Sequence, residues 1–215
     1  LASIGLIHLD RGLFNPASDY FKRSMEAYGK VGDDYGRASA ALNCGIVEYR
    51  LGRFSESARL IEFAVKGFEG CGWQLGVCRS LIAMGNVERY RGHLKEALEL
   101  YESARESAMK KGFLREKSMS EGCIGRANFM LKDYEKAERW YQAGLDTASP
   151  DSDTNLQISR YIAELYSVTG KRGKAECYYS MALEMAEKLK AGRDKGLLYA
   201  EMAKAEFSQG DPRKG

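Results

Sequence analysis

The chain has 215 residues, of which 44% are apolar and 29% are charged, and its formal net charge is +3. This composition is ordinary for a globular domain, and so small a net charge argues against a strongly basic nucleic-acid-binding protein. No run of about 18 apolar residues is present, which excludes a membrane-spanning helix, and no signal peptide is visible, so we expect a cytoplasmic protein.

Helical periodicity extends over nearly the whole chain, because apolar residues recur at spacings of three and four and glycines interrupt the pattern at regular intervals. The pattern predicts first helices near 1–11, 34–51, 74–91, 114–131, 153–169 and 194–209. Second helices are predicted between them, near 15–30, 54–70, 94–111, 134–148 and 173–190. Pro16 fits the first turn of a helix, Pro150 follows a helix end, and Pro212 fits the start of a helix that the sequence does not complete.

These helices repeat with a period of about 40 residues, which lies in the range of helical solenoid repeats. The clearest columns are Gly5, Gly45, Gly85 and Gly125, then Gly12, Gly52 and Gly92, and then Gly32, Gly72 and Gly112. A column of small residues (Ala17, Ser57, Ala97, Ala137 and Ala175) is followed four positions later by a column of large ones (Phe21, Ile61, Tyr101, Tyr141 and Tyr179). The register slips by two positions between Gly125 and Ala163, and Lys132 takes the place of a glycine.

The repeated columns have a direct structural meaning. Small residues such as Gly85 and Ala97 allow two helices to approach closely, and a large ring such as Tyr101 fills the space beside them. Glycines such as Gly92 lie where one helix must stop and the chain must turn. We expect the second helices to end at Gly32, Gly72, Gly112 and Gly192. A single helix pair cannot bury its apolar face alone, so the pairs must stack on their neighbours.

The columns resemble the tetratricopeptide repeat, whose pattern is a large residue, two positions, Leu-Gly, two positions and Tyr, followed by Ala, three positions and Phe. The matching positions are Leu1-x-x-Ile4-Gly5 with Ala17-x-x-x-Phe21, Leu81-x-x-Met84-Gly85 with Ala97-x-x-x-Tyr101, Ile124-Gly125 with Ala137-x-x-x-Tyr141, and Ile162-Ala163-x-x-Tyr166 with Ala175-x-x-x-Tyr179. The resemblance implies an all-α, right-handed superhelical solenoid of stacked antiparallel helix pairs, with about five repeats and one extra helix.

The repeats differ from the usual tetratricopeptide unit, because each is about six residues longer and lacks the closing proline. This long form resembles the repeats of maltose-regulator-type signalling proteins, peptide-pheromone receptors and polarity adaptors. The expected boundaries are 1–32, 33–72, 73–112, 113–150, 151–192 and a partial repeat at 193–215. All belong to a single solenoid, which we expect to be a fragment of a longer protein because no polar capping helix is visible at either end.

Catalytic and metal-binding patterns are missing from the sequence. The five cysteines have irregular spacings and the two histidines, His8 and His93, are isolated, so neither a zinc site nor a nucleophile–base pair is predicted. We therefore expect neither an enzyme nor a cofactor-binding protein. The cysteines are expected to be reduced, buried thiols, and Trp73 and Trp140 are expected to pack between repeats.

The resemblance also implies that the first helices line a concave groove in which a partner binds. The predicted lining combines amides and apolar residues with arginines and aromatic rings: Asn43, Ile46, Tyr49, Arg50, Asn86, Arg89, Tyr90, Arg126, Phe129 and Arg160. The four arginines would form a basic ladder along the groove, which suits an acidic peptide or protein segment. Aromatic rings are favoured at binding hot spots, although a solvated helix face also carries arginine and asparagine.

The leading functional hypothesis is a protein-interaction scaffold, in particular the regulatory or sensor module of a signalling protein. The alternative is a homo-oligomerisation module of a signalling or transcription regulator. An RNA-binding helical repeat is less favoured, because Leu42, Ile82 and Gly122, which occupy equivalent positions, vary without a base-reading code.

Overall fold

The computed structural model describes the backbone of residues 1–209 and the side chains of residues 1–204. The helices are α1 (Ala2–Asp10), α2 (Phe14–Val31), α3 (Asp34–Arg50), α4 (Phe54–Gly70), α5 (Gln74–Arg91), α6 (Leu94–Lys111), α7 (Leu114–Met130), α8 (Tyr134–Thr147), α9 (Asp153–Val168), α10 (Arg172–Lys188) and α11 (Gly192–Gln209). Each of the eleven predicted helices is confirmed, with every end within two residues of its predicted position. Pro212 lies outside the described residues.

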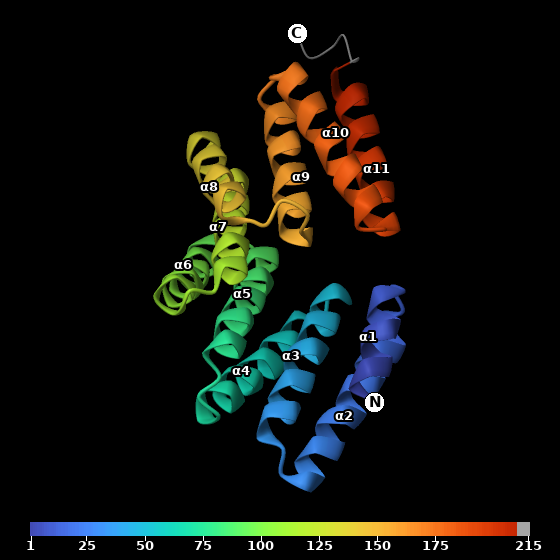
Figure 1. Cartoon of the computed structure of the whole chain (residues 1–215), viewed down its shortest axis with the longest axis vertical. Coiled ribbons are helices and arrows are strands. Elements are labelled where there is room, and N and C mark those ends of the chain that lie inside the picture. Colours follow the sequence, from blue (N-terminus) through green and yellow to red (C-terminus); the bar gives the residue numbers. More distant parts are fainter. Residues whose placement is uncertain (210–215) are drawn as a thin grey trace. The chain divides into compact units, whose positions relative to one another are not determined.

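The helices are grouped in two compact units, of which the first is Leu1–Glu116 and the second begins at Lys117. In the first unit each of the helices α1 to α5 packs antiparallel against the next one in the chain, so that α6 packs against α5 (Figure 1). In the second unit α8, α9, α10 and α11 pack in the same successive manner, and α11 also contacts α9. Both units are therefore stacks of antiparallel helix pairs. Within residues 1–209, none of the helices combines the length and the apolar character needed to cross a lipid bilayer.

The turn after α5 shows how the predicted glycines end the helices. Gly92 has a φ of +86°, its N–H donates to the carbonyl of Arg89 at 3.2 Å, and the N–H of His93 donates to the carbonyl of Glu88 at 2.9 Å. These two bonds satisfy carbonyl groups that the helix leaves unpaired at its end. The prediction that Gly192 ends a second helix is wrong, because Lys190, with a φ of +54°, is the left-handed residue after α10 and Gly192 begins α11.

The core lies between the first and second helices of each repeat. A methyl group added to Gly85 would overlap the Tyr101 ring, and one added to Gly125 would lie 2.5 Å from the Tyr141 ring. Both rings are fully buried. The predicted close approach of two helices beside a large ring is therefore confirmed in both units.

The prediction for Trp73 is confirmed, and the prediction for the cysteines is correct only in part. Trp73 packs between repeats as predicted, since its ring centroid lies 4.8 Å from that of Tyr35 and 5.0 Å from that of Phe68. All five cysteines are free thiols, and Cys44 and Cys78 are buried. The prediction of buried thiols is wrong for Cys71 and Cys177, which are exposed. Cys71 directly follows α4 at a turn, where the chain faces solvent.

Candidate partner-binding site

The residues predicted to bind a partner lie on first helices of both units. In the first unit they come from α3 and α5, which contact each other. We call this surface the first-helix face of the first unit; it comprises Asn43, Ile46, Tyr49, Arg50, Asn86, Arg89 and Tyr90. Arg50 and Tyr90 are exposed, Arg89 is buried, and the other four side chains are half-buried. In the second unit the predicted residues lie on α7 and α9, and all of them are half-buried.

An aromatic cluster lies where α3 and α5 end. The rings of Tyr49 and Tyr90 meet edge to face, with centroids 4.9 Å apart and an interplanar angle of 87°. The Phe54 ring lies 6.3 Å from both of them, and the guanidinium carbon of Arg89 lies 4.7 Å from the Tyr90 ring centroid. Tyr90 nevertheless remains 58% exposed. We call these four residues the Tyr90 cluster; it holds a large ring in one orientation while most of the ring faces solvent.

The chemistry of the Tyr90 cluster follows from the repeat. Tyr49-Arg50 and Arg89-Tyr90 occupy equivalent positions of consecutive repeats, but in reversed order. Each position therefore carries a ring in one repeat and a guanidinium group in the other, so the two chemistries alternate over a small surface. The Tyr90 ring, packed against its neighbours in the cluster, has little side-chain entropy to lose when a partner binds. The guanidinium groups can in addition pair with carboxylates in a bidentate manner.

Phe54 belongs to the Tyr90 cluster although it is not among the residues predicted to bind a partner. It is the first residue of α4 and follows the turn at Gly52. A sequence signal for it does exist, because large apolar residues occupy this position in four consecutive repeats. These residues are Phe14, Phe54, Leu94 and Tyr134. The column was missed because it lies just outside the first helices.

Asn86 contributes to the core as well as to the first-helix face. The hydroxyl group of Tyr101 donates a hydrogen bond to its Oδ1 at 2.9 Å. Because the Tyr101 ring is fully buried, this bond satisfies a hydroxyl group at the edge of the core. The sequence places Asn86 only in the groove lining, but its amide oxygen also serves the core of the repeat, which limits what it can offer to a peptide backbone.

The arginines of the second unit have carboxylate partners within that unit. Arg126 Nη1 lies 2.5 Å from Glu164 Oε2, and its guanidinium carbon lies 4.9 Å from the Phe129 ring centroid and 5.0 Å from that of Tyr161. Burial disfavours the charged form of this guanidinium, but the adjacent carboxylate outweighs burial and raises its pKa. The group is therefore a fixed, charged bridge between α7 and α9.

Arg160 is enclosed in a similar way. Its side chain is only 15% exposed and lies 3.8 Å from both Asp194 and Glu201 of α11. Burial raises the pKa of the Glu201 carboxyl, while the nearby Arg160 opposes that shift. A partner's carboxylate would have to compete with these acids, so the basic surface of the second unit is largely neutralised from within.

The sequence predicts that His93 is isolated, and this is wrong. Its Nδ1 lies 2.8 Å from Oε2 of Glu88, because the turn after α5 brings together two residues that are five positions apart. Glu48 and Arg53 form the equivalent pair one repeat earlier, with 3.1 Å between Nη1 and Oε2. The recurrence of a glutamate followed five positions later by a basic residue is the sequence signal for these pairs. Both pairs link the end of a first helix to the start of the second helix that follows it.

No cluster of three or more potential metal ligands occurs in the part of the chain that the structure describes. On the first-helix face of the first unit, Arg50 and Tyr90 are the exposed residues among those predicted to bind a partner.

Comparisons with known proteins address the fold. No family model matches the sequence, and no curated protein matches it significantly. A Rap protein complexed with competence and sporulation factor is 17% identical with a TM-score of 0.84, over 92% of this chain and 56% of the Rap chain. The Rap conjugation gene regulator of plasmid pLS20, in complex with a Phr peptide, is 14% identical with a TM-score of 0.86, over 97% and 58% of the two chains. The TPR-like repeats of a Podospora anserina kinesin light chain are 14% identical with a TM-score of 0.63, over 88% and 94%.

The chain spans somewhat more than half the length of the two Rap proteins that it matches. At identities of 14% to 17%, these matches bear on architecture alone. The regularly spaced columns, the antiparallel helix pairs and the structural matches together show that the chain has the fold of the tetratricopeptide-repeat proteins.

Proposed function

We propose that this chain is a protein-interaction module with a regulatory role, and that it binds a peptide or protein segment on the first-helix face of its first unit. The observation that carries the proposal is the Tyr90 cluster, in which an exposed ring is braced by two other rings and a guanidinium group. Exposed tyrosines held in this way are typical of binding hot spots. The Rap proteins that share the fold, solved with a factor or a peptide bound, support the same reading.

The preferred partner is a segment that carries an acidic residue next to an apolar one. Arg50 is exposed beside the Tyr90 cluster, and a guanidinium group pairs with carboxylates in a bidentate manner. Arg126, Phe129 and Arg160 would provide a further surface in the second unit, but there a partner's carboxylate competes with Glu164. We therefore assign the acidic preference chiefly to the first unit, and we propose that the module binds its partner without catalysing a reaction.

The test is a selection of random dodecapeptides displayed on phage against the wild-type protein. Enriched peptides are synthesised with a fluorescent label, and their dissociation constants are measured by fluorescence anisotropy. We expect Tyr90→Ala to weaken binding about tenfold or more, and Arg50→Glu to weaken the binding of peptides that contain Asp or Glu. Tyr199→Ala is the matched control, because Tyr199 is 56% exposed but lies on α11 in the second unit.

Two results would contradict the proposal: the absence of any enriched peptide, or an equal loss of affinity in Tyr90→Ala and Tyr199→Ala. Sedimentation velocity at increasing protein concentration addresses the alternative of self-association. A mass that rises with concentration and falls back in Tyr90→Ala would assign the same face to a second copy of the chain instead of a peptide.

A further inference from the structure

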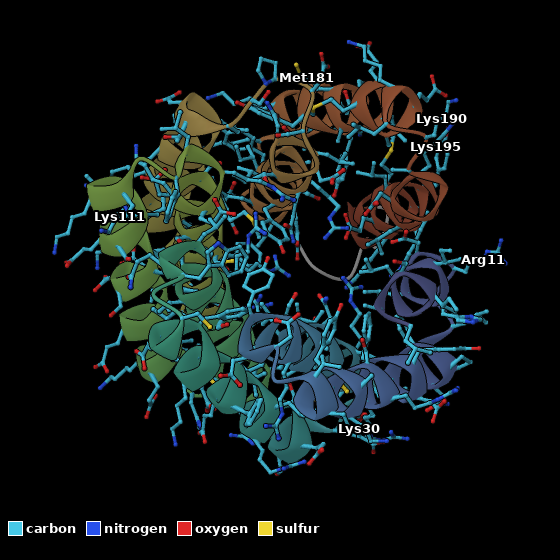
Figure 2. The ribbon with its side chains drawn as sticks, turned by 60° about the horizontal axis from the view of Figure 1, so that its bottom comes forward. Arg11, Lys30, Lys111, Met181, Lys190 and Lys195 are labelled. Carbon is cyan, nitrogen blue, oxygen red and sulfur yellow. The ribbon has the colours of Figure 1, made fainter. Side chains whose placement is uncertain are left out.

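A cleft of about 680 Å³ opens between α2 and α4 in the first unit. We call it the outer cleft. Its lining residues come from two second helices and from the start of α3, and they include Met25, Gly29, Lys30, Arg37 and Leu60. None of the lining residues belongs to the first-helix face. Lys30, near the end of α2, projects away from the helices (Figure 2).

The outer cleft has an apolar floor. Leu60 is almost fully buried and belongs to the core formed with Phe21 and Val47, and the half-buried Met25 packs against the same core. Gly29 adds no side chain to the α2 side of the cleft. The space beside it is open, because a methyl group there would lie no nearer than 3.6 Å to the Arg37 side chain. Methionine adapts its shape to different apolar partners, so this floor suits an inserted side chain.

The rim of the outer cleft is basic. Its lining includes four cationic side chains and two carboxylates, Glu26 and Glu56. Of the cations, Lys22 lies 3.0 Å from the buried Glu48 and Arg59 is paired with Glu56, so Lys30 and Arg37 give the rim its basic character. Glu56 is already engaged, because Arg59 donates to it twice, at 2.9 and 2.7 Å. The guanidinium carbon of Arg37 lies 4.8 Å from the Phe63 ring centroid. Stacking of this kind fixes the plane of a guanidinium group, which then presents its N–H edges for bidentate pairing.

A second hollow occurs at equivalent positions of the repeat in the second unit. It has a volume of about 360 Å³ and is lined by Lys136, Arg139, Trp140 and Ala143 of α8. The first three of these correspond to Glu56, Arg59 and Leu60 of α4, two repeats earlier in the chain. An apolar side chain next to an arginine on a second helix therefore recurs in both units, although Lys136 replaces Glu56 and neither hollow contributes to the first-helix face of the first unit.

We propose that the outer cleft is a second interaction site, which binds an acidic amphipathic helix of a partner protein. A helix fits because the cleft lies between two helices that each pack on α3, so a third helix can lie along them. Its apolar side chains would cover Met25 and Leu60, and its carboxylates would pair with Arg37 and Lys30. This site is independent of the first-helix face, so the module has two binding surfaces.

The probe is a fluorescently labelled, end-capped helical peptide built from Glu, Ala and Leu, with leucines on one face. A peptide with Lys at every Glu position is its control. Two variants alter the outer cleft in different ways. Lys30→Glu/Arg37→Glu reverses the charge of the rim, whereas Gly29→Phe fills the cleft and leaves its charge unchanged. The matched control is Lys95→Glu/Lys111→Glu on α6, which changes the net charge equally but lies outside the cleft. Circular dichroism verifies that every variant is folded.

We expect the Glu peptide to bind and the Lys peptide not to bind. Both cleft variants should weaken binding at least tenfold, whereas Lys95→Glu/Lys111→Glu should leave it within about twofold, since rim charges outside a contact contribute little. No binding of the Glu peptide, or the same loss in the α6 control, would overturn the proposal. A loss with Tyr90→Ala alone would move the peptide to the first-helix face and leave the outer cleft without a role.

Discussion

The buried carboxylate of Glu48 shows how a single residue joins neighbouring helices. Its side chain is 0% exposed, and it accepts a hydrogen bond from Ser18 Oγ at 2.5 Å and lies 3.0 Å from Lys22 Nζ and 3.1 Å from Arg53 Nη1. Burial by itself would raise the pKa of this carboxyl, but the hydrogen bonds from these three residues outweigh burial and lower the pKa. The charged form therefore connects α2, α3 and the start of α4.

We expect Glu48→Gln to lower the free energy of unfolding by about 1–3 kcal/mol at pH 7. A carboxyl whose pKa is lower in the folded state contributes stability above its unfolded value, near 4.5, and loses that contribution as the pH falls through the folded value. The difference between wild type and Glu48→Gln should therefore shrink below about pH 4.5. Urea unfolding at several pH values measures this difference, with Glu62→Gln, an exposed site on α4, as the control. A difference that does not change with pH would contradict the assigned role of the charge.

At the scale of the helix, the ends of the elements depend on single left-handed residues. Gly12, Gly52, Gly92 and Gly170 follow the first helices with φ values between +73° and +86°. After α7 the same position is occupied by Lys132, with a φ of +63°. An L-residue with a side chain is disfavoured in this region, because its Cβ approaches the following carbonyl oxygen. The turn after α7 therefore has the same backbone conformation as the others, but with strain at Lys132.

We expect Lys132→Gly to raise the free energy of unfolding by about 0.5–1 kcal/mol, since relief of the left-handed strain exceeds the added entropy of the unfolded chain. Gly52→Lys, the reverse exchange at the equivalent turn after α3, should lower it by a similar amount. Lys132→Ala separates the causes, because it removes the charge and keeps the strain, so little change is expected. Thermal and urea unfolding measure all three. Equal stabilisation by alanine and glycine would show that the lysine side chain, rather than the backbone, is responsible.

For the whole molecule, the fold could be predicted from the sequence because repetition multiplies a weak signal. One Gly92 or one Tyr101 indicates little, but columns at a constant interval fix where each helix starts, turns and packs. The predicted helix ends are wrong where the repeated glycine columns are interrupted. The left-handed residue after α10 is Lys190 instead of Gly192, because the register has slipped by two positions before that point.

The candidate site could be predicted only in part. Helical periodicity placed Tyr49 and Tyr90 on adjacent first helices, and their contact follows from that placement. Periodicity does not show which side chains find partners within the protein. Arg126 is paired with Glu164, which belongs to the following repeat, and this contact depends on how two repeats stack. The outer cleft was missed for the same reason, because it lies between two second helices that do not follow each other in the chain.

A close contact between a glycine and a large side chain recurs in successive helix pairs, and one pair has alanine in place of the glycine. Gly45, Gly85 and Gly125 each contact a large side chain of the next helix, whereas Ala163 occupies the equivalent position in the fifth helix pair, α9–α10, and is fully buried in the same core cluster as Tyr179. The α9–α10 pair therefore accommodates one more methyl group than its equivalents.

We expect Gly125→Ala to lower the free energy of unfolding by about 1–3 kcal/mol, because the new methyl group would overlap the Tyr141 ring, 2.5 Å away. Ala163→Gly should also destabilise, by about 0.5–1 kcal/mol, because glycine is a poor helix former and leaves a small void. In a Tyr141→Leu background, where the ring is absent, Gly125→Ala should lower the free energy of unfolding by less than half as much as in the wild type. Urea unfolding of the wild type, Gly125→Ala, Tyr141→Leu and the double variant gives this double-mutant cycle. If Gly125→Ala were to stabilise the protein, as a Gly-to-Ala exchange does in an open helix, the ring would not determine the spacing of the pair.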